Sequence, residues 1–287
     1  MLGIRVPRIL TVCVVTWPLV GCAPSHGDAT TRGVGSDSLT SAGGTTGGTA
    51  TTFGTGSDTG SGAATGPSLD VGASAGSTTG PANCESTIPV TIRDFHASHP
   101  DFESYIGEDP GIVLPDLGPD GKPVYAGQAG NPSTTGQANF DQWYRDVPGV
   151  NQTIPWSLDL VEIAPGTWGF DDQEFFPIDD QGFGNEGNPH NYHFTLELHS
   201  TFVYGGGEVF TFRGDDDLFL FLNGKLAIDL GGVHGPLEAT VDLDAQAAAL
   251  GLSPGGTYDF DLFFAERHTT QSSFRIETTI SCFVPPG

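Results

Sequence analysis

The stretch Phe212-Arg-Gly-Asp-Asp-Asp-Leu-Phe-Leu-Phe-Leu-Asn-Gly-Lys225 contains the strongest structural signal in the chain. Its centre, Leu218–Leu222, is apolar at every position, which is typical of a strand buried on both faces of a sheet. Asn223-Gly224 follows at once, and this dipeptide favours a two-residue hairpin turn. The stretch therefore predicts a central buried strand and a tight return to its neighbour.

Alternating apolar residues flank this stretch on both sides. Tyr192–Phe202 alternates with period two, and Tyr204–Glu208 contains three glycines that predict a turn. Phe210 and Phe212 are expected to continue the same apolar face on a returning strand. The pattern recurs at Leu226–Leu230, Tyr258–Phe264 and Phe274–Ile280.

The first half of this region is looser. Ile88–Phe95 and Trp156–Ile163 are its strand candidates, separated by long loops rich in Pro and Gly. Two short helices are expected, Phe140–Asp146 and Ala245–Leu250, the second capped by Asp244 and ended by Gly251. Strand after strand with glycine turns predicts an all-β domain, a sandwich or barrel with short helices, over residues 84–287.

Residues 1–21 are typical of a lipoprotein signal peptide. Arg5 and Arg8 precede an apolar run from Ile9 to Val20 that is too short to cross a bilayer. Leu19-Val-Gly-Cys22 resembles a lipobox, so Cys22 is the predicted lipidation site. Ala23 follows the cysteine where an Asp would favour retention, which indicates the outer membrane. The alternative is an ordinary signal peptide that happens to contain a cysteine.

Residues 22–83 are dominated by Gly, Ser and Thr and cannot bury a core. We expect a disordered tether, which at this length spans about 40 Å root-mean-square. Together with the lipid, it would hold the folded domain clear of the membrane, in a lipid-anchored position on the extracellular side of the cell surface.

The charge of the chain excludes two classes of partner. Asp and Glu number 35 against 10 Lys and Arg, for a formal net charge of −25. Such a surface repels nucleic acid and anionic lipid headgroups, so we expect no nucleic-acid partner and membrane contact only through the lipid anchor.

The chain has four cysteines. Cys13 leaves with the signal peptide and Cys22 is the lipid site, so Cys84 and Cys282 remain near the two ends of the predicted domain. In an oxidising compartment this pair predicts a disulfide. A two-thiol metal site is the alternative, although no Cys-x-x-Cys spacing is present.

Six motifs resemble the fibro-slime domain and occur in its order across residues 90–280. That domain is in turn similar to the PA-14 type of β-barrel found in protective antigen, glycosidases and cell-surface adhesins. The motifs are Ile92–Glu103, Trp143–Asn151, Asn191–Thr195, Phe212–Asp217, Asp229–Gly235 and Phe264–Thr269.

In the adhesin branch, a pair of aspartates holds a calcium ion that in turn holds sugar hydroxyls. The resemblance places this pair at Asp215 and Asp216, with Asp217 in place of a glycine and Asn223 in place of an aspartate. It implies a calcium site at Asp215, Asp216 and Asp217, and ligand contacts from Asn223, Gly232, His234 and Glu266.

Charge repulsion independently favours a cation at the three aspartates. Three adjacent carboxylates repel one another unless something positive neutralises them, and calcium is the oxygen-binding cation of extracellular proteins. The alternative is a solvated turn whose carboxylates cap backbone amides. Arg267 is expected to pair with a carboxylate, while His190 and His193 in an extended segment face opposite sides and do not predict zinc.

The predicted function is calcium-dependent binding of an extracellular polysaccharide or glycoconjugate, without catalysis. A structural surface module stabilised by calcium is the second possibility. A polysaccharide hydrolase using Glu197, Glu266 or the aspartates is the third. Trp143, Tyr144, Trp156 and Trp168 are either sugar-stacking residues or part of the core.

The lipid anchor predicts that cells fed a palmitate analogue will label the wild-type protein and leave Cys22→Ala unlabelled. Cys13→Ala is the matched control and should label like the wild type. Equal labelling of Cys22→Ala and the wild type would reject the anchor.

Overall fold

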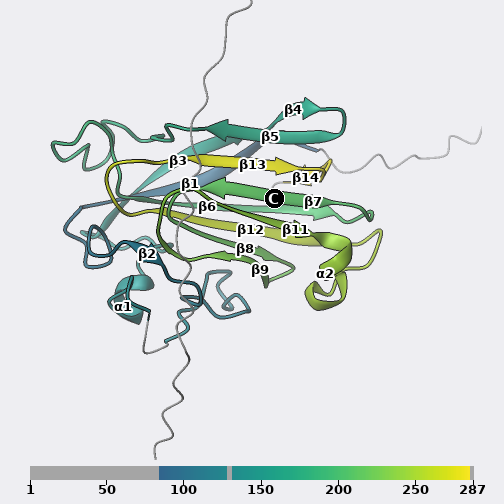
Figure 1. Cartoon of the computed structure of the whole chain (residues 1–287), viewed down its shortest axis with the longest axis horizontal. Helices are drawn as coiled ribbons and strands as arrows, with labels where there is room; N and C mark the ends of the chain where they lie inside the picture. Colours follow the sequence, from purple (N-terminus) through teal and green to yellow (C-terminus); the bar gives the residue numbers. More distant parts are fainter. Residues whose placement is uncertain (1–83, 128–130, 285–287) are drawn as a thin grey trace, which may run out of the picture. The chain divides into compact units, whose positions relative to one another are not determined.

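The computed structural model describes residues 84–127 and 131–284, so the predicted signal peptide, lipid site and tether lie outside the described residues. Two antiparallel sheets carry most of this region (Figure 1). The larger has the order β3-β1-β6-β12-β8-β9, with β14 also paired to β6. Its strands are β1 (Thr87–Phe95), β3 (Asn151–Asp159), β6 (Phe194–Val203), β8 (Asp217–Leu222), β9 (Lys225–Leu230), β12 (Thr257–Glu266) and β14 (Phe283–Val284).

The smaller sheet has the order β11-β7-β13-β5-β4, and β2 pairs separately with β10. The region is therefore all-β with two short helices, as the sequence predicts. The smaller elements are β2 (Gly107–Glu108), α1 (Gln137–Phe140), β4 (Val161–Ala164), β5 (Thr167–Asp172), β7 (Val209–Gly214), β10 (Gly232–Val233), β11 (Leu237–Asp242), α2 (Leu243–Leu250) and β13 (Phe274–Thr278).

The larger sheet is buried on both faces, which explains the uninterrupted apolar sequence of β8. Leu218, Leu220 and Leu222 belong to the main core, together with inward side chains of the smaller sheet. Phe219 and Phe221 lie on the other face and pack in a second cluster under the 96–150 segment. Burial of each such side chain stabilises the fold by about 1.5–3 kcal/mol.

The β8–β9 hairpin is confirmed. Asn223 and Gly224 both adopt the positive φ of a two-residue turn, at 53° and 70°. The predicted return after Tyr204–Glu208 is wrong in one respect, because β7 does not pair with β6. The chain instead crosses to the smaller sheet, where Phe210 and Phe212 face the main core from the opposite side.

Trp156–Ile163 was predicted as one strand and forms parts of two. β3 ends at Asp159 in the larger sheet and β4 starts at Val161 in the smaller one. Between them Leu160 is buried, and its N–H donates to Ser86 O at 2.7 Å. A single apolar run of the sequence therefore contains the end of a strand in one sheet, the connection, and the start of a strand in the other sheet.

The helices are displaced from their predicted bounds. α2 is capped by Asp242, whose side chain accepts the Ala245 N–H at 3.0 Å, and ends at left-handed Gly251 as predicted. Asp244 instead accepts the Tyr204 hydroxyl at 2.6 Å. Within the described residues no helix combines the length and hydrophobicity needed to span a bilayer.

The predicted disulfide is confirmed: Cys84 and Cys282 are bonded and join the two ends of the domain. Closing a loop with a sequence separation of 198 residues stabilises the fold by up to about 5 kcal/mol in the chain-entropy account. The four aromatic candidates for sugar stacking are structural. Trp143 and Tyr144 are fully buried in the second cluster, while Trp156 and Trp168 pack against the main core.

Candidate functional site

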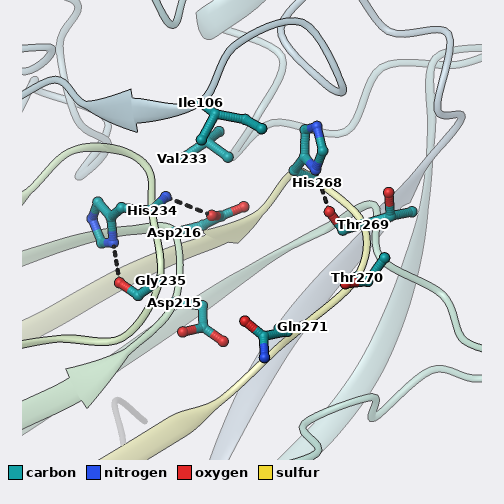
Figure 2. A pocket seen from close by; sticks show the side chains of 10 residues that line it. All are labelled: Ile106, Asp215, Asp216, Val233, His234, Gly235, His268, Thr269, Thr270 and Gln271. Atoms are coloured by element: carbon teal, nitrogen blue, oxygen red, sulfur yellow. Dashed lines mark hydrogen bonds between the residues drawn. The ribbon is translucent and has the colours of Figure 1, made fainter.

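A pocket of about 180 Å³ lies where the chain passes from β7 in the smaller sheet to β8 in the larger one. Asp215 and Asp216 form that connection. Figure 2 shows Ile106 and Val233 on one side of the pocket and Asp215 and Gln271 on the other. The remaining lining residues are His234, Gly235, His268, Thr269 and Thr270.

Asp217 is neutralised by Arg267. Arg267 Nε donates to Asp217 Oδ2 at 2.6 Å, and neither side chain is exposed. Asp217 Oδ1 accepts the Gly232 N–H at 2.7 Å. Both oxygens are thus occupied by protein donors, so the prediction of Asp217 as a metal ligand is corrected: the positive charge that faces it belongs to the protein.

Arg267 also ties the loops over the second face of the large sheet to its centre. Its Nη1 donates to the carbonyl oxygens of Asp101 at 2.8 Å and Ser133 at 2.7 Å. The guanidinium carbon lies 4.6 Å from the centre of the Trp143 ring, a cation–π distance. The expectation that Arg267 pairs with a carboxylate is confirmed, and its reach is wider than expected.

Asp216 holds two backbone segments together at the floor of the pocket. Its Oδ1 accepts the His234 N–H at 3.1 Å and its Oδ2 accepts the Arg267 N–H at 2.8 Å. Burial raises the pKa of Asp216 to about 7, against the opposing charge of Arg267. Asp216 therefore joins the β10–β11 loop to the end of β12.

Asp215 and Glu266 are the acidic groups of the site that the protein compensates least. Asp215 Oδ1 and both carboxylate oxygens of Glu266 are buried without a hydrogen bond of good geometry, although Ser273 beside Asp215 and Ser272 beside Glu266 partly offset the cost of burial. Burial, and then the charge of Asp216, raise the pKa of Glu266 well above its usual range. Burial likewise raises the pKa of Asp215. Unpaired buried carboxylates are costly, so this is where a ligand or a cation would be most stabilising.

Of the four predicted ligand-binding residues, the structure places three at or beside the pocket and one far from it. Asn223 is not in the site: it follows the last residue of β8, about 20 Å from Asp217 at 3.3 Å per residue. There its side chain donates to Leu250 O at 2.8 Å and anchors α2. This is a correction, because an extended strand separates the two ends of the motif.

The other three lie at the pocket or beside it. His234 lines it, Glu266 belongs to its buried acidic group, and Gly232 contributes only its backbone N–H to Asp217. Gly232 has φ of 115°, and a Cβ there would meet Gly107 O at 2.4 Å. A glycine is required at this position by close packing against β2, not by a ligand.

The histidines that the structure describes bind carboxylates and backbone groups, not one another. His190 Nδ1 lies 2.6 Å from Asp179 Oδ2, while His193 and His268 meet opposite oxygens of Glu103 at 2.9 and 3.3 Å. Across the described part of the chain, no three or more His, Cys, Asp or Glu side chains are arranged to hold a metal ion. Glu103 also accepts the Thr269 N–H at 2.8 Å, and so fixes the segment that lines the pocket.

Glu197, a candidate hydrolase carboxylate, is used structurally. It is 4% exposed and bonds to Arg93 Nη1 at 2.6 Å, with Lys122 and His199 as further partners. Three basic partners leave it neither free to act as a nucleophile nor placed in the pocket.

The described region is thus an all-β domain with an acidic pocket at the connection between its sheets. The family model of the PA14 domain matches residues 178–282, a range that contains the aspartates, the β8–β9 hairpin and Glu266. Residues 178–282 therefore match the PA14 domain. The narrower fibro-slime assignment stays a prediction.

Similar proteins include protein psiD of Dictyostelium discoideum, 40% identical in an alignment 211 residues long that covers 68% of this chain and 41% of psiD. Protein psiR of the same organism is 41% identical in an alignment 207 residues long that covers 65% of this chain and 20% of psiR. The chain thus spans about two fifths and one fifth of these relatives. A solved PA14 sugar-binding domain from an RTX adhesin aligns with 67% of this chain and 89% of that one, at 10% identity and a TM-score of 0.30.

Because the Asp217–Arg267 pair is buried, Arg267→Met should lower the free energy of unfolding strongly. This variant leaves Asp217 charged, buried and unpaired, which costs about 3–5 kcal/mol of the free energy of unfolding. Urea unfolding of the full chain measures the loss. Adding Asp217→Leu should recover part of it, because no unpaired charge then remains.

Arg275→Met is the matched control. Arg275 pairs with Glu277 on the partly exposed side of β13, at 37% and 35% side-chain exposure. Its loss should cost below about 1 kcal/mol. Equal costs for Arg267→Met and Arg275→Met would contradict the structural role of the Asp217–Arg267 pair.

Proposed function

We propose that the chain is a cell-surface glycan-binding protein whose PA14 domain holds sugar hydroxyls through a calcium ion at the acidic pocket. One observation carries the proposal. Asp215 and Glu266 together have three buried carboxylate oxygens without a hydrogen bond of good geometry, beside the raised-pKa carboxyl of Asp216. A bound cation removes the repulsion that protein groups leave uncompensated there.

Calcium fits this donor set better than zinc or magnesium. It is a hard cation that takes six to eight oxygen ligands, including carboxylates, backbone carbonyls and water. Asp215 and Glu266 would supply the carboxylates, with Asp216 beside them. Because no three acidic or histidine side chains of the described residues converge on one point, backbone carbonyls, water and ligand hydroxyls must complete the shell. Positions open to exchange are what sugar binding through a metal requires.

The pocket also suits one face of a sugar ring. Ile106 is 72% exposed and lies with Val233 on one side of the pocket, so an apolar surface faces the ligand there. Gln271 and His234 offer side-chain hydrogen-bonding groups elsewhere on the wall. An apolar wall with a few polar groups is the usual composition of small-molecule sites.

The predicted lipid anchor and tether would display this domain at the cell surface. The Cys84–Cys282 disulfide supports an oxidising compartment, where such bonds persist. We propose binding rather than catalysis, because Glu197 is bonded to Arg93 and Lys122 and so is not free to act as a catalytic carboxylate.

Glu266→Gln tests the cation directly. In chelator the variant should melt no lower than the wild type, since a neutral amide replaces a buried carboxyl whose ionisation is opposed by burial and by the charge of Asp216. In millimolar calcium the wild type should gain about 2.7 kcal/mol at a hundredfold excess over the dissociation constant. The variant should lose most of that gain, and magnesium should substitute poorly. Thermal melts of the full chain measure both effects.

Glu238→Gln is the control, since Glu238 is an exposed carboxylate on β11. It should keep the calcium response of the wild type. Glycan-array binding with and without chelator completes the test. Calcium stabilisation without any glycan binding would favour a structural module, turnover of a polysaccharide would favour a hydrolase, and a melt insensitive to calcium would remove the support for the proposal.

A further inference from the structure

A second and larger cavity of about 480 Å³ adjoins the acidic pocket. The two share Asp215, Thr270 and Gln271 in their linings, so they meet at these residues. The second cavity is built by the segment after β5, which contains Phe176, and the segment before β6, which contains His190 and Tyr192. No group of this cavity takes part in the proposed calcium site except Asp215.

The aromatic side of this cavity is rigid. Phe176 and His190 stack in parallel, with ring centres 4.0 Å apart and an interplanar angle of 9°. Tyr192 meets Phe176 edge-on at 5.1 Å. Asp179 orders the group, since its Oδ2 lies 2.6 Å from His190 Nδ1 while its Oδ1 accepts the Asn191 N–H at 2.7 Å. Binding there therefore costs little side-chain entropy.

Phe176 and His190 remain partly exposed although Tyr192 is buried. A flat, ordered and partly exposed ring stack matches the apolar C–H face of a pyranose, and polar groups stand close to it for the hydroxyls. Gln173, Glu174 and Gln271 are the exposed ones, while the buried Ser272 and Ser273 line the same cavity. The combination of aromatic surface with polar rim is that of a saccharide subsite.

The volumes of the two cavities indicate how long a ligand they can bind. Cavities that bury small ligands are typically about 300–1,000 Å³. The acidic pocket, at about 180 Å³, lies below that range and the second cavity lies inside it. A ligand confined to the acidic pocket would therefore bury little of its surface, whereas one that continues past Asp215 would bury much more.

We propose that the Phe176–His190 cavity is a second subsite, and that the ligand is an oligosaccharide of at least two units rather than a monosaccharide. One unit lies at the acidic pocket and the next stacks on Phe176. This inference rests on the proposed glycan-binding function and adds to it the chain length of the ligand and the residues that determine it.

The test compares saccharides of increasing length on the full chain in calcium. The probes are the methyl glycosides of glucose, galactose, mannose and N-acetylglucosamine, each with its β-linked disaccharide and trisaccharide. Titration calorimetry should give at least tenfold tighter binding for one disaccharide than for its monosaccharide. Phe176→Ala and Phe176→Leu should abolish that tenfold gain and leave monosaccharide affinity unchanged, while Phe176→Trp should keep it.

Phe183→Ala is the matched control. Phe183 is also stacked on a histidine, His96, with ring centres 3.7 Å apart, but it lines neither cavity. It should preserve the disaccharide preference. Equal affinity for monosaccharide and disaccharide, or a preference that survives both Phe176→Ala and Phe176→Leu, overturns the subsite and leaves the acidic pocket standing. Failure of every saccharide to bind overturns the proposed function itself.

Discussion

The ion pair between Asp217 and Arg267 is the interaction on which the rest of the structure depends. Asp217 begins β8, and Arg267 follows the last residue of β12, the strand paired with β8 at the middle of the large sheet. From there Arg267 reaches the carbonyls of Asp101 and Ser133 and the ring of Trp143. One buried cation thus joins the sheet to the long segment that covers its second face. Without that cover, Phe219 and Phe221 would face water and the all-apolar sequence of β8 would be unfavourable.

Because Asp217 pairs with Arg267, the three adjacent aspartates have different partners. Asp217 pairs with Arg267. Asp216 accepts hydrogen bonds from two backbone amides and so joins two loops of the pocket. One oxygen of Asp215 and both oxygens of the fully buried Glu266 have no hydrogen bond of good geometry. One arginine faces these four carboxyls, and burial raises the pKa of Asp215, Asp216 and Glu266. Asp215 and Asp216 line the open pocket. In the proposed function a cation compensates these carboxyls, and in the further inference the adjoining aromatic cavity offers a surface for the ring of a sugar.

Sequence patterns predicted the elements whose signal is local. The buried β8, its Asn223-Gly224 turn, the period of β12 and the Cys84–Cys282 bond follow from neighbouring residues or from counting cysteines. Which sheet a strand joins is a long-range property, so the crossing of β7 and the corner at Leu160 could not be seen. At the site, charge and resemblance indicated Asp215, Asp216, His234 and Glu266. The prediction for Asn223 was wrong, because the extended strand β8 separates it from the aspartates at the other end of the same motif. Phe176 and His190 lie in loops without periodicity, where no pattern distinguishes a binding surface from a core.

The central claim is that a calcium ion compensates the surplus carboxylates of the pocket. Crystals of the chain grown in calcium, measured at a wavelength where calcium scatters anomalously, test it most directly. The account predicts an anomalous peak in contact with Asp215 and Glu266, next to Asp216, with further oxygen ligands at about 2.3–2.6 Å. A pocket that binds no calcium in such crystals, with both carboxylates left unpaired, would contradict it.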